Sequence, residues 1–488
     1  MSKCILHIKD EVNVKIEGLD LHARKKLSNK FKYEVPYARY LPAVRLGRWD
    51  GKIAFFQLGG STYTNLLPDI IPVLDELGYE IELNDLREYK TNFNFEAVNE
   101  DSYSHLTWPD GHVVAGEPIK VRDYQIGTIN KFLENPQSIQ EIATGAGKTL
   151  VTAILSHKIE PYGRSIVIVP NKSLVTQTEE DYINMGLDVG VFFGDRKEFG
   201  KTHTICTWQS LNILLKKTKN AEAPISIGEF IEDVVCVMVD EVHMAKADVL
   251  KTLLTSVFAH VPIRWGLTGT IPKENFEWKS LHVSLGDVTA RIQASELQDQ
   301  GVLARCHVNV VQLQDYGDHG NYQQELKYLL TNADRLKYMS KLFNKISESG
   351  NTLILVDRIK AGNDLVEMLG DKAVFVSGAT KGVDRKTEYD EIANVDGKII
   401  VATYGVASVG INIPRIFNLV LLEPGKSFVR VIQSIGRGIR KAEDKDFVQV
   451  WDITSTCKFA KRHLTKRKKF YKEANYPFQV EKVDWEAK

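Results

Sequence analysis

Ile142-Ala143-Thr144-Gly145-Ala146-Gly147-Lys148-Thr149 is the stretch that decides how this chain is interpreted. It lies between an apolar run that ends at Ile142 and a helical pattern that begins at Leu150. Glycines allow a loop to point backbone N–H groups at an anion beside a helix N-terminus, while lysine adds a cation and threonine a magnesium-binding hydroxyl. We expect a triphosphate-binding loop, although Ile142 replaces the first glycine of the fullest motif and an ordinary glycine-rich turn is the alternative. The expected contacts are Thr144, Gly145, Ala146, Gly147, Lys148 and Thr149, with Thr149 also a Mg²⁺ ligand.

Length and composition limit the possible classes of protein. A chain of 488 residues is too long for one hydrophobic core and predicts about three folding units. Lysine plus arginine equals aspartate plus glutamate at 63 each, so any nucleic-acid surface must be local. No apolar run approaches the roughly 20 residues of a membrane span, and no signal-peptide core follows Met1. We therefore expect a cytoplasmic protein without membrane partners.

The cysteines argue against a structural metal. The five cysteines are far apart, mostly inside strand-like apolar runs, and no Cys-x-x-Cys occurs. This distribution is typical of reduced, buried thiols rather than of a zinc or iron–sulfur site.

Residues 1–112 predict a small α+β module. Strand patterns at 5–16 and 52–58 mix with helical patterns at 21–31 and 70–77. Between residues 25 and 52, cations alternate with aromatic residues, as in a surface that binds phosphates and supports bases. A solvated basic helix beside buried aromatics remains the alternative. The candidate contacts in this module are Arg48, Trp49 and Lys52.

The same module contains a second, weaker pattern. Asp69, Glu88 and Lys90 have the order used by many magnesium-dependent nucleases, in which two carboxylates hold the metal. An acid at Asp69, directly after a proline, also suits the first turn of a helix. The nuclease is therefore a remote alternative.

From residue 121 the strands alternate with helices, which predicts parallel sheets. Unalternated apolar runs at 165–169, 204–207, 234–239 and 264–267 predict strands buried on both faces. A second series follows, at 352–356, 373–376, 398–402, 419–422 and 447–451. Two series predict two α/β domains, at 113–300 and 301–457. Residues 458–488 lose strand character and predict a basic helical tail, which either contacts nucleic acid or forms a solvated face.

Two further stretches complete a set of nucleotide-hydrolysing residues. Asp240 and Glu241 end an apolar strand, where the aspartate can hold Mg²⁺ and the glutamate can orient or deprotonate the attacking water. Gln433 to Arg440 carries Arg437 and Arg440 three positions apart, so that both can reach a γ-phosphate from the second domain. We expect catalysis by Lys148, Asp240, Glu241, Gln433, Arg437 and Arg440, and closure of the two domains on ATP.

The ordered set resembles the superfamily 2 helicases and translocases over residues 121–455. The resemblance implies two RecA-like domains, ATP as cofactor, and motif II of the DExH type at Asp240-Glu241-Val242-His243. It also implies adenine recognition by Arg122 and Gln125, a motif III at Leu267-Thr268-Gly269-Thr270, and a motif V that ends at Gly410, which we count among the nucleotide contacts. Asn412 departs from the aspartate often found late in motif V. The nucleic-acid contacts that it implies are Pro170, Asn171, Lys172, Gln177, Thr207, Trp208, Gln209, Thr403 and Tyr404.

A narrower resemblance rests on residues outside most of these motifs. Leu46 to Lys52, Gly78-Tyr79, Thr403 to Val406 and the overall length are similar to the phage UvsW-type branched-DNA helicases. This implies an accessory N-terminal DNA-binding domain and action on forks, D-loops and four-way junctions. Duplex DNA or RNA translocation without junction preference stays open, as does a passive DNA-binding protein, although the intact motifs argue against the latter.

Overall fold

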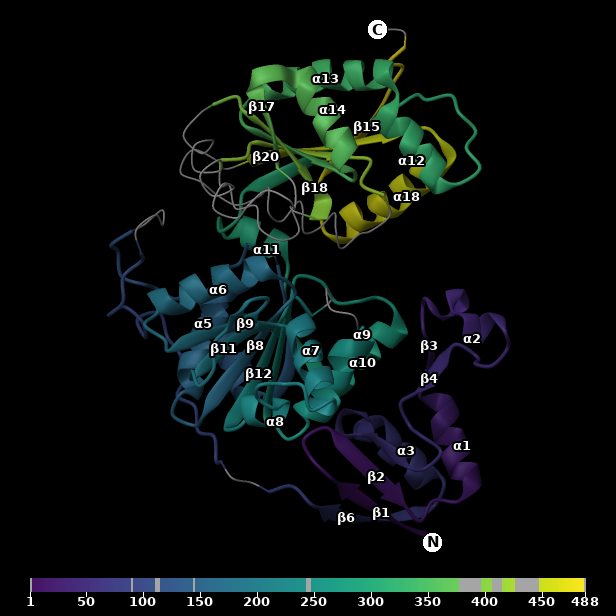
Figure 1. The fold of residues 1–488 in the computed structure, drawn as a ribbon, viewed down its shortest axis with the longest axis vertical. Coiled ribbons are helices and arrows are strands. Elements are labelled where there is room, and N and C mark those ends of the chain that lie inside the picture. Colours follow the sequence, from purple (N-terminus) through teal and green to yellow (C-terminus); the bar gives the residue numbers. More distant parts are fainter. Residues whose placement is uncertain are drawn as a thin grey trace. The chain divides into compact units, whose positions relative to one another are not determined.

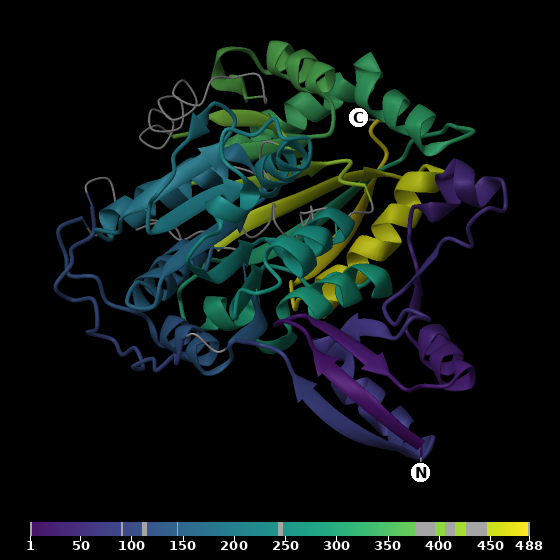
Figure 2. The same cartoon turned by 60° about the horizontal axis from the view of Figure 1, so that its bottom comes forward.

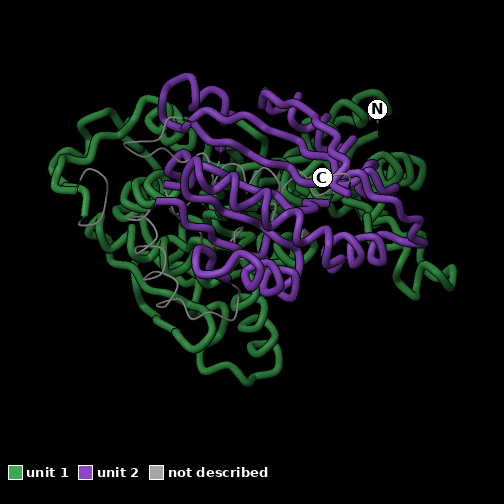
Figure 3. Tube along the Cα trace, turned by 90° about the horizontal axis from the view of Figure 1, so that it is seen from above, with its two compact units in different colours: residues 1–142, 148–291 green, residues 143–147, 292–488 purple. Residues whose placement is uncertain are grey.

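The computed structural model describes residues 2–88, 91–109, 115–143, 145–242, 247–376, 396–405, 415–425 and 447–486. The chain divides into unit 1, residues 1–142 and 148–291, and unit 2, residues 143–147 and 292–488 (Figure 3). This division lies close to the boundary expected near residue 300. The predicted α/β class, with two parallel-sheet domains and a small N-terminal α+β domain, is confirmed.

The N-terminal module of unit 1 contains a four-stranded sheet in the order β5-β2-β1-β6. Its strands are β1 (Ser2–Ile8), β2 (Asn13–Glu17), β5 (Ser61–Tyr63) and β6 (Tyr79–Asp85), and its helices are α1 (Leu21–Lys30) and α3 (Leu67–Glu76). Cys4, Leu6 and Ile8 alternate along β1 and are buried. The run expected as one strand at 5–16 is a hairpin, because the Asp10 carboxylate accepts the N–H groups of Val12 and Asn13 and forms a turn.

A smaller antiparallel pair, β3 (Lys32–Glu34) and β4 (Lys52–Ala54), carries the 3-10 turn Ala38–Tyr40 and helix α2 (Pro42–Arg45). The strand expected at 52–58 ends at Ala54, since Phe55 and Phe56 turn into the core of the module. That core also contains Phe276 and Val283 of α10 (Asn275–Leu285), so the module packs directly on the following α/β domain.

The α/β domain of unit 1 has an eight-stranded sheet in the order β10-β9-β11-β8-β12-β13-β7-β14. The strands are β7 (Gln137–Ile142), β8 (Arg164–Val169), β9 (Val189–Phe193), β10 (Arg196–Lys197), β11 (His203–Thr207), β12 (Val234–Asp240), β13 (Ile263–Thr268) and β14 (Asp287–Ile292). The pairs from β9 to β7 are parallel. The helices besides α10 are α4 (Asp123–Glu134), α5 (Lys148–Ile159), α6 (Lys172–Asn184), α7 (Trp208–Lys219), α8 (Ile227–Phe230) and α9 (Ala247–Thr252), which a π-helical turn at Leu253–Val257 continues. Helices α5 and α6 cover one face of this sheet, and α7 and α10 the other (Figure 1).

Unit 2 contains a seven-stranded sheet in the order β17-β18-β16-β19-β20-β15-β21. The strands, all paired in parallel, are β15 (Arg305–Leu313), β16 (Thr352–Val356), β17 (Ala373–Val376), β18 (Ile399–Thr403), β19 (Asn418–Leu422), β20 (Phe447–Ser455) and β21 (Phe478–Val483). The helices are α11 (Ala294–Asp299), α12 (Tyr322–Thr331), α13 (Ala333–Ser347), α14 (Ile359–Leu369) and α18 (Lys458–Glu473). In Figure 2, α18 lies alongside the strands of unit 2, and β20 is the strand that it contacts most.

The expected helical tail needs one correction. Helix α18 is present, but Phe478–Val483 form β21, which pairs with β15 at the edge of the sheet. Only Val483 of this strand is buried, so main-chain hydrogen bonds rather than an apolar run determine its position, and hydrophobic periodicity could not indicate it.

The structure also shows the state of the cysteines and the character of the helices, on which the sequence made predictions. All five cysteines are unpaired by disulfides and buried, as expected. No helix within the described residues is both long and apolar enough to cross a membrane.

Candidate nucleotide and nucleic-acid sites

The predicted phosphate loop joins β7 to α5. Gly145 and Gly147 adopt φ angles of +91° and +75°, which a residue with a Cβ adopts only with strain. The Ala146 N–H donates to the carbonyl oxygen of Ala143 at 3.3 Å, which closes the turn. Thr144 lies outside the described residues. The backbone of this loop therefore requires glycine at both positions and turns immediately before the first residue of α5, Lys148.

Lys148 forms a buried ion pair with Glu241. The Lys148 Nζ lies 3.0 Å from the Glu241 Oε1, and each side chain is only 9% exposed. The same Nζ donates to the Ile142 carbonyl oxygen at 3.4 Å. Because a buried charge needs a partner, the ammonium and the carboxylate each compensate the charge of the other inside unit 1. The cation expected to bind phosphate and the acid expected to handle water are thus in direct contact.

Glu241 is also joined to the segment after β13. It has a φ of +50°, which is rare for a residue other than glycine and costs free energy unless its surroundings enforce it. Its N–H donates to Asp240 Oδ1 at 2.9 Å, and its Oε2 accepts the N–H of Gly269 at 3.2 Å. Beyond Gly269, the Thr268 hydroxyl donates to the carbonyl oxygen of Thr270 at 2.7 Å and so closes a tight turn. Glu241 thereby connects the lysine of the phosphate loop to motif III.

The order of the strands explains why these groups meet. Strand β13 lies between β7 and β12, and all three are parallel. Their carboxyl ends therefore lie at one edge of the sheet, where ligands bind in open α/β folds. The phosphate loop, Asp240 with Glu241, and motif III each leave the sheet at that edge.

The predicted adenine-reading pair forms the start of α4. The Gln125 side chain is 4% exposed, and its Oε1 accepts the Arg122 N–H at 3.1 Å, as in a helix-capping interaction. The Arg122 Nη1 donates to the Tyr124 hydroxyl at 3.4 Å. Their role toward adenine stays a prediction.

The first domain's expected strand-contacting residues gather at the same edge of its sheet. Val169 and Thr207 are paired across β8 and β11, so the segments that follow them emerge side by side. The Gln209 Nε2 donates to the Pro170 carbonyl oxygen at 3.2 Å and ties the two segments together. The side chains of Asn171 and Thr207 cap α6 and α7, and Trp208 packs partly on the core. Lys172 and Gln209 are exposed, whereas Gln177 is half-buried in α6.

Two predicted nucleic-acid contacts, Tyr404 and Trp49, pack at least partly against other residues of the protein. Tyr404 is 2% exposed and donates its hydroxyl hydrogen to the Leu422 carbonyl oxygen at 3.2 Å, so its side chain packs inside unit 2 and its role toward nucleic acid stays a prediction. Thr403 ends β18 beside it. Trp49 packs partly on the N-terminal core and donates its indole N–H to the Lys52 carbonyl oxygen, while Arg48 and Lys52 are exposed. Gln433, Arg437, Arg440 and Gly410 lie outside the described residues.

The residues of the nuclease alternative have separate surroundings. Asp69 is in the first turn of α3, where an acid favours the helix, and pairs with Lys279 at 3.7 Å. Glu88 instead lines a pocket with Glu160 and Arg164. Lys90 lies outside the described residues.

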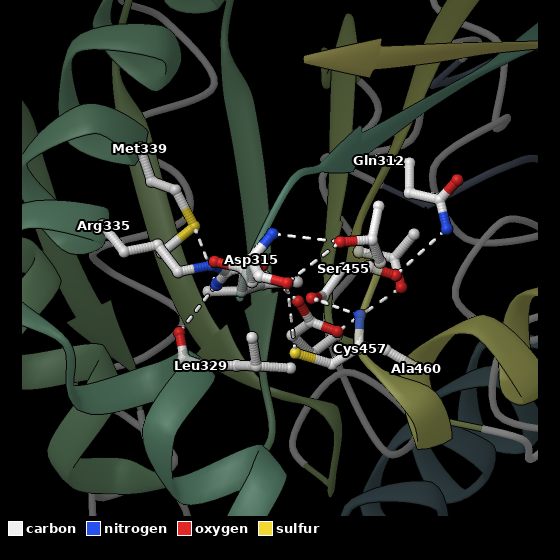
Figure 4. A network of polar contacts seen from close by, with 12 residues as sticks. Gln312, Asp315, Leu329, Arg335, Met339, Ser455, Cys457 and Ala460 are labelled. Atoms are coloured by element: carbon white, nitrogen blue, oxygen red, sulfur yellow. Dashed lines mark hydrogen bonds and ion pairs between the residues drawn. The ribbon is translucent and has the colours of Figure 1, made fainter. Parts of the chain in front are cut away.

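Unit 2 contains a buried polar cluster that the sequence did not predict (Figure 4). Arg335 of α13 contacts Asp315 at 3.1 Å and Glu423 at 2.7 Å, and all three side chains are almost fully buried. Burial raises the pKa of Glu423 to about 7, against the opposing effect of Arg335. These residues come from separate elements, so no local pattern indicates that they meet.

Comparison with known proteins matches both α/β domains. Residues 118–273 match the family of the res subunit of type III restriction enzymes, and residues 334–442 match the helicase conserved C-terminal domain. The chain is 25% identical to the ATP-dependent DNA helicase uvsW of Enterobacteria phage T4, over 97% of this chain and 94% of the relative. It is 22% identical to the DNA 3'-5' helicase XPB of Kineococcus radiotolerans, over 75% of this chain and 65% of the relative.

Solved structures share the fold at lower identity. The DNA-bound Type ISP restriction-modification enzyme LlaBIII aligns with a TM-score of 0.57 and 15% identity, covering 85% of this chain and 34% of that protein. Dbp5 of S. cerevisiae, bound to RNA and ADP BeF3, aligns with a TM-score of 0.51 and 16% identity, covering 75% of this chain and 90% of that protein.

Proposed function

The chain belongs to the superfamily 2 helicases and is an ATP-dependent helicase, and from this premise we propose that it acts on DNA and that its substrates are branched DNAs. The proposed substrates are forks, D-loops and four-way junctions, remodelled by branch migration, fork regression and unwinding. The similarity to the phage T4 helicase supports the proposal because it covers 97% of this chain and so includes the N-terminal module.

One surface of that module has the composition expected of a DNA-binding surface. Residues 35–49, which we call the arginine projection, contain Arg39, Arg45 and Arg48 and no acidic residue. The Arg39 guanidinium lies 4.8 Å from the ring centroid of Tyr40, and helix α2 buries none of its residues. Tyr40 is 60% exposed and Leu46 64% exposed. Cations beside exposed aromatic and apolar side chains suit DNA whose bases are partly unstacked, as at a branch point.

The arginine projection and its base contact the first α/β domain. At its base, Lys32 of β3 pairs at 2.6 Å with Asp50, which lies two residues before β4. The Tyr37 hydroxyl contacts Asp248 of α9 at 3.2 Å, and the Lys251 Nζ lies 4.4 Å from the ring centroid of Phe55. Movement of the first α/β domain during ATP turnover would therefore move the projection with it.

The contacts of Glu241 provide a route by which ATP binding and hydrolysis can change the contacts of motif III. Phosphate oxygens compete with Glu241 for Lys148, because both are anions that bind an ammonium group. A Glu241 carboxylate that has lost Lys148 is able to orient or deprotonate water, and its remaining bond to the Gly269 N–H carries the change to motif III. We include Gln433, Arg437 and Arg440 as the second domain's catalytic contribution on the strength of their motif.

The proposal includes Mg²⁺. Thr149 in the first turn of α5 and Asp240 at the end of β12 supply a hydroxyl and a carboxylate, the hard oxygen donors that Mg²⁺ prefers. Bound there, Mg²⁺ would supply positive charge beside the phosphates. Asp240 and Thr149 are the residues that would hold it.

Substitution of the projection tests branched-DNA recognition. Deleting residues 1–112 would expose Phe276 and Val283 of the shared core, so point substitutions are the better perturbation. We expect Arg39→Gln, Arg45→Gln and Arg48→Gln combined to weaken junction binding and ATP-driven strand exchange about tenfold or more, with little change on linear duplex or in DNA-free ATP hydrolysis. The matched control replaces three exposed lysines of α7 by glutamine: Lys216, Lys217 and Lys219.

A labelled four-way junction, incubated with and without ATP, separates the alternatives. ATP-dependent strand exchange supports the proposal, and ATP-independent cleavage supports the nuclease alternative that uses Asp69, Glu88 and Lys90. Equal activity of the intact protein on linear duplex and on junctions refutes junction preference and supports translocation on DNA or RNA without it.

A further inference from the structure

Helix α18 has one strongly basic exposed face. Its exposed residues recur every three or four positions, so they form a single stripe. We call this stripe the α18 basic face, and it consists of Lys458, Lys461, Arg462, Thr465, Lys466, Lys469 and Lys472. The helix contains one acid, Glu473, at its last position. Helix α14 of the same unit instead places Asp364 and Glu367 beside Lys360.

The opposite face of α18 is anchored by charges. Arg467 is 1% exposed, and its Nε and Nη2 donate to the two carboxylate oxygens of Asp452 at 2.8 and 2.9 Å. The Tyr471 hydroxyl donates to the same carboxylate at 2.7 Å, and the Arg467 Nη1 donates to the Gly425 carbonyl oxygen at 2.7 Å. A bidentate buried pair fixes both the position and the rotation of a helix.

The beginning of α18 is equally well held (Figure 4). Glu325 of α12 is 1% exposed, and its two oxygens accept the N–H groups of Ala460 at 2.7 Å and Phe459 at 3.0 Å. The Cys457 N–H donates to the Ser455 hydroxyl at 3.0 Å. Helix α18 is therefore a fixed part of the second domain, and its basic face has a fixed orientation on that domain.

Like charges three and four positions apart repel one another and destabilise a helix. A helix face that serves only solubility is more stable when lysines alternate with glutamates, but the α18 basic face contains no such alternation. Its length from Lys458 to Lys472 is about 21 Å at 1.5 Å per residue, which matches about six base pairs of a duplex. The neutral net charge of the whole chain makes such a one-signed surface a local feature.

We propose that the α18 basic face binds the sugar–phosphate backbone of DNA, as a contact of the second domain separate from the helicase motifs. The inference rests on the proposed function only in that the chain acts on DNA. Lysines at this spacing neutralise phosphates without reading bases, so the contact is independent of sequence. It gives the second domain its own attachment to the DNA, distinct from the arginine projection of unit 1.

The salt dependence of DNA binding tests this proposal. The test variant of the full chain combines Lys461→Gln, Arg462→Gln and Lys466→Gln, which keep good helix formers on the helix. Binding to a labelled linear duplex is measured without ATP between 50 and 200 mM salt. The slope of log K against log salt should fall in magnitude by about 2.7, which is three contacts at about 0.9 each. Affinity at the lower salt should fall about tenfold or more.

Two controls keep the outcome decisive. The variant Lys216→Gln, Lys217→Gln and Lys219→Gln removes the same charge from α7 and should keep the parent slope. Lys461→Arg with Lys466→Arg keeps the charge on α18 and should also keep it.

The outcomes separate the two proposals. An unchanged slope in the α18 variant, with normal DNA-free ATP hydrolysis and thermal unfolding, overturns the role of α18. Failure of the parent chain to prefer junctions overturns only the proposed function, because the α18 test uses linear duplex.

Discussion

Replacing Glu241 by glutamine separates the chemistry of ATP hydrolysis from ATP binding. Glutamine keeps an oxygen that can accept the Gly269 N–H, now at 3.2 Å from Glu241 Oε2, so the turn after β13 keeps its anchor. It removes the negative charge 3.0 Å from Lys148 and the base expected to act on water. Lys148 then loses a competitor for phosphate, so ATP binding should be equal to or tighter than in the parent.

Hydrolysis should fall far more than binding changes. A positioned general base contributes about 10²- to 10⁴-fold, which corresponds to about 2.7 to 5.4 kcal/mol of transition-state stabilisation. Steady-state phosphate release with saturating DNA measures the rate, and titration with a fluorescent ATP analogue measures affinity. Glu141→Gln is the matched control, because Glu141 accepts the Ile271 N–H at 3.3 Å and pairs with Arg291 near the same edge of the sheet.

Glu141→Gln should retain hydrolysis within a few-fold of the parent. The assignment of Glu241 is refuted if Glu241→Gln hydrolyses ATP within tenfold of the parent rate. It is also refuted if ATP affinity collapses while hydrolysis at saturation is normal, because the side chain would then serve binding alone.

Two further predictions concern unit 2. Burial raises the folded-state pKa of Glu423 to about 7, so between about pH 4.5 and 7 the folded state holds a proton that the unfolded state has released. Stability therefore falls as pH rises through this range. Glu423→Gln should remove roughly 2 to 3 kcal/mol of the fall that urea unfolding measures between pH 5 and pH 8, and an unchanged pH dependence contradicts this prediction. Arg467→Met leaves the Asp452 carboxylate buried without its cation and should lower the free energy of unfolding by about 3 to 5 kcal/mol in chemical denaturation. The control Lys466→Met, at an exposed neighbouring position, should lower it by less than about 0.5 kcal/mol. Equal losses of stability in the two variants would disprove the anchoring role of Arg467.

Local patterns were sufficient for most of the architecture. The apolar runs at β8, β11, β12 and β13 indicated buried parallel strands. Each of these strands is covered on both faces, so its apolar residues do not alternate with exposed polar ones. The phosphate loop could also be predicted from the sequence, because Gly145 and Gly147 adopt positive φ angles that other residues avoid. Strand β21 was not predicted, because its backbone pairs at the edge of the sheet while most of its side chains stay exposed.

Other features depended on contacts between distant residues. Tyr404 belongs to a motif expected to contact DNA, yet its ring is buried against unit 2, and a motif does not reveal which way a side chain points. Arg467 is one of several cations in a basic run, but its guanidinium pairs with the Asp452 carboxylate on β20 and its side chain turns inward. The separation of α18 into a buried anchor and an exposed basic face follows from that pairing.

By itself the sequence determined which chemical groups this helicase has and which elements carry them, because loop composition, strand runs and adjacent acids are properties of neighbouring residues. Only the tertiary structure decided that β13 lies between β7 and β12, that Glu241 joins Lys148 to Gly269, and that Arg467 anchors α18. The physical reason is that strand pairing and buried ion pairs are chosen by the packing of segments far apart in the chain, and a periodicity along one segment does not identify its neighbour.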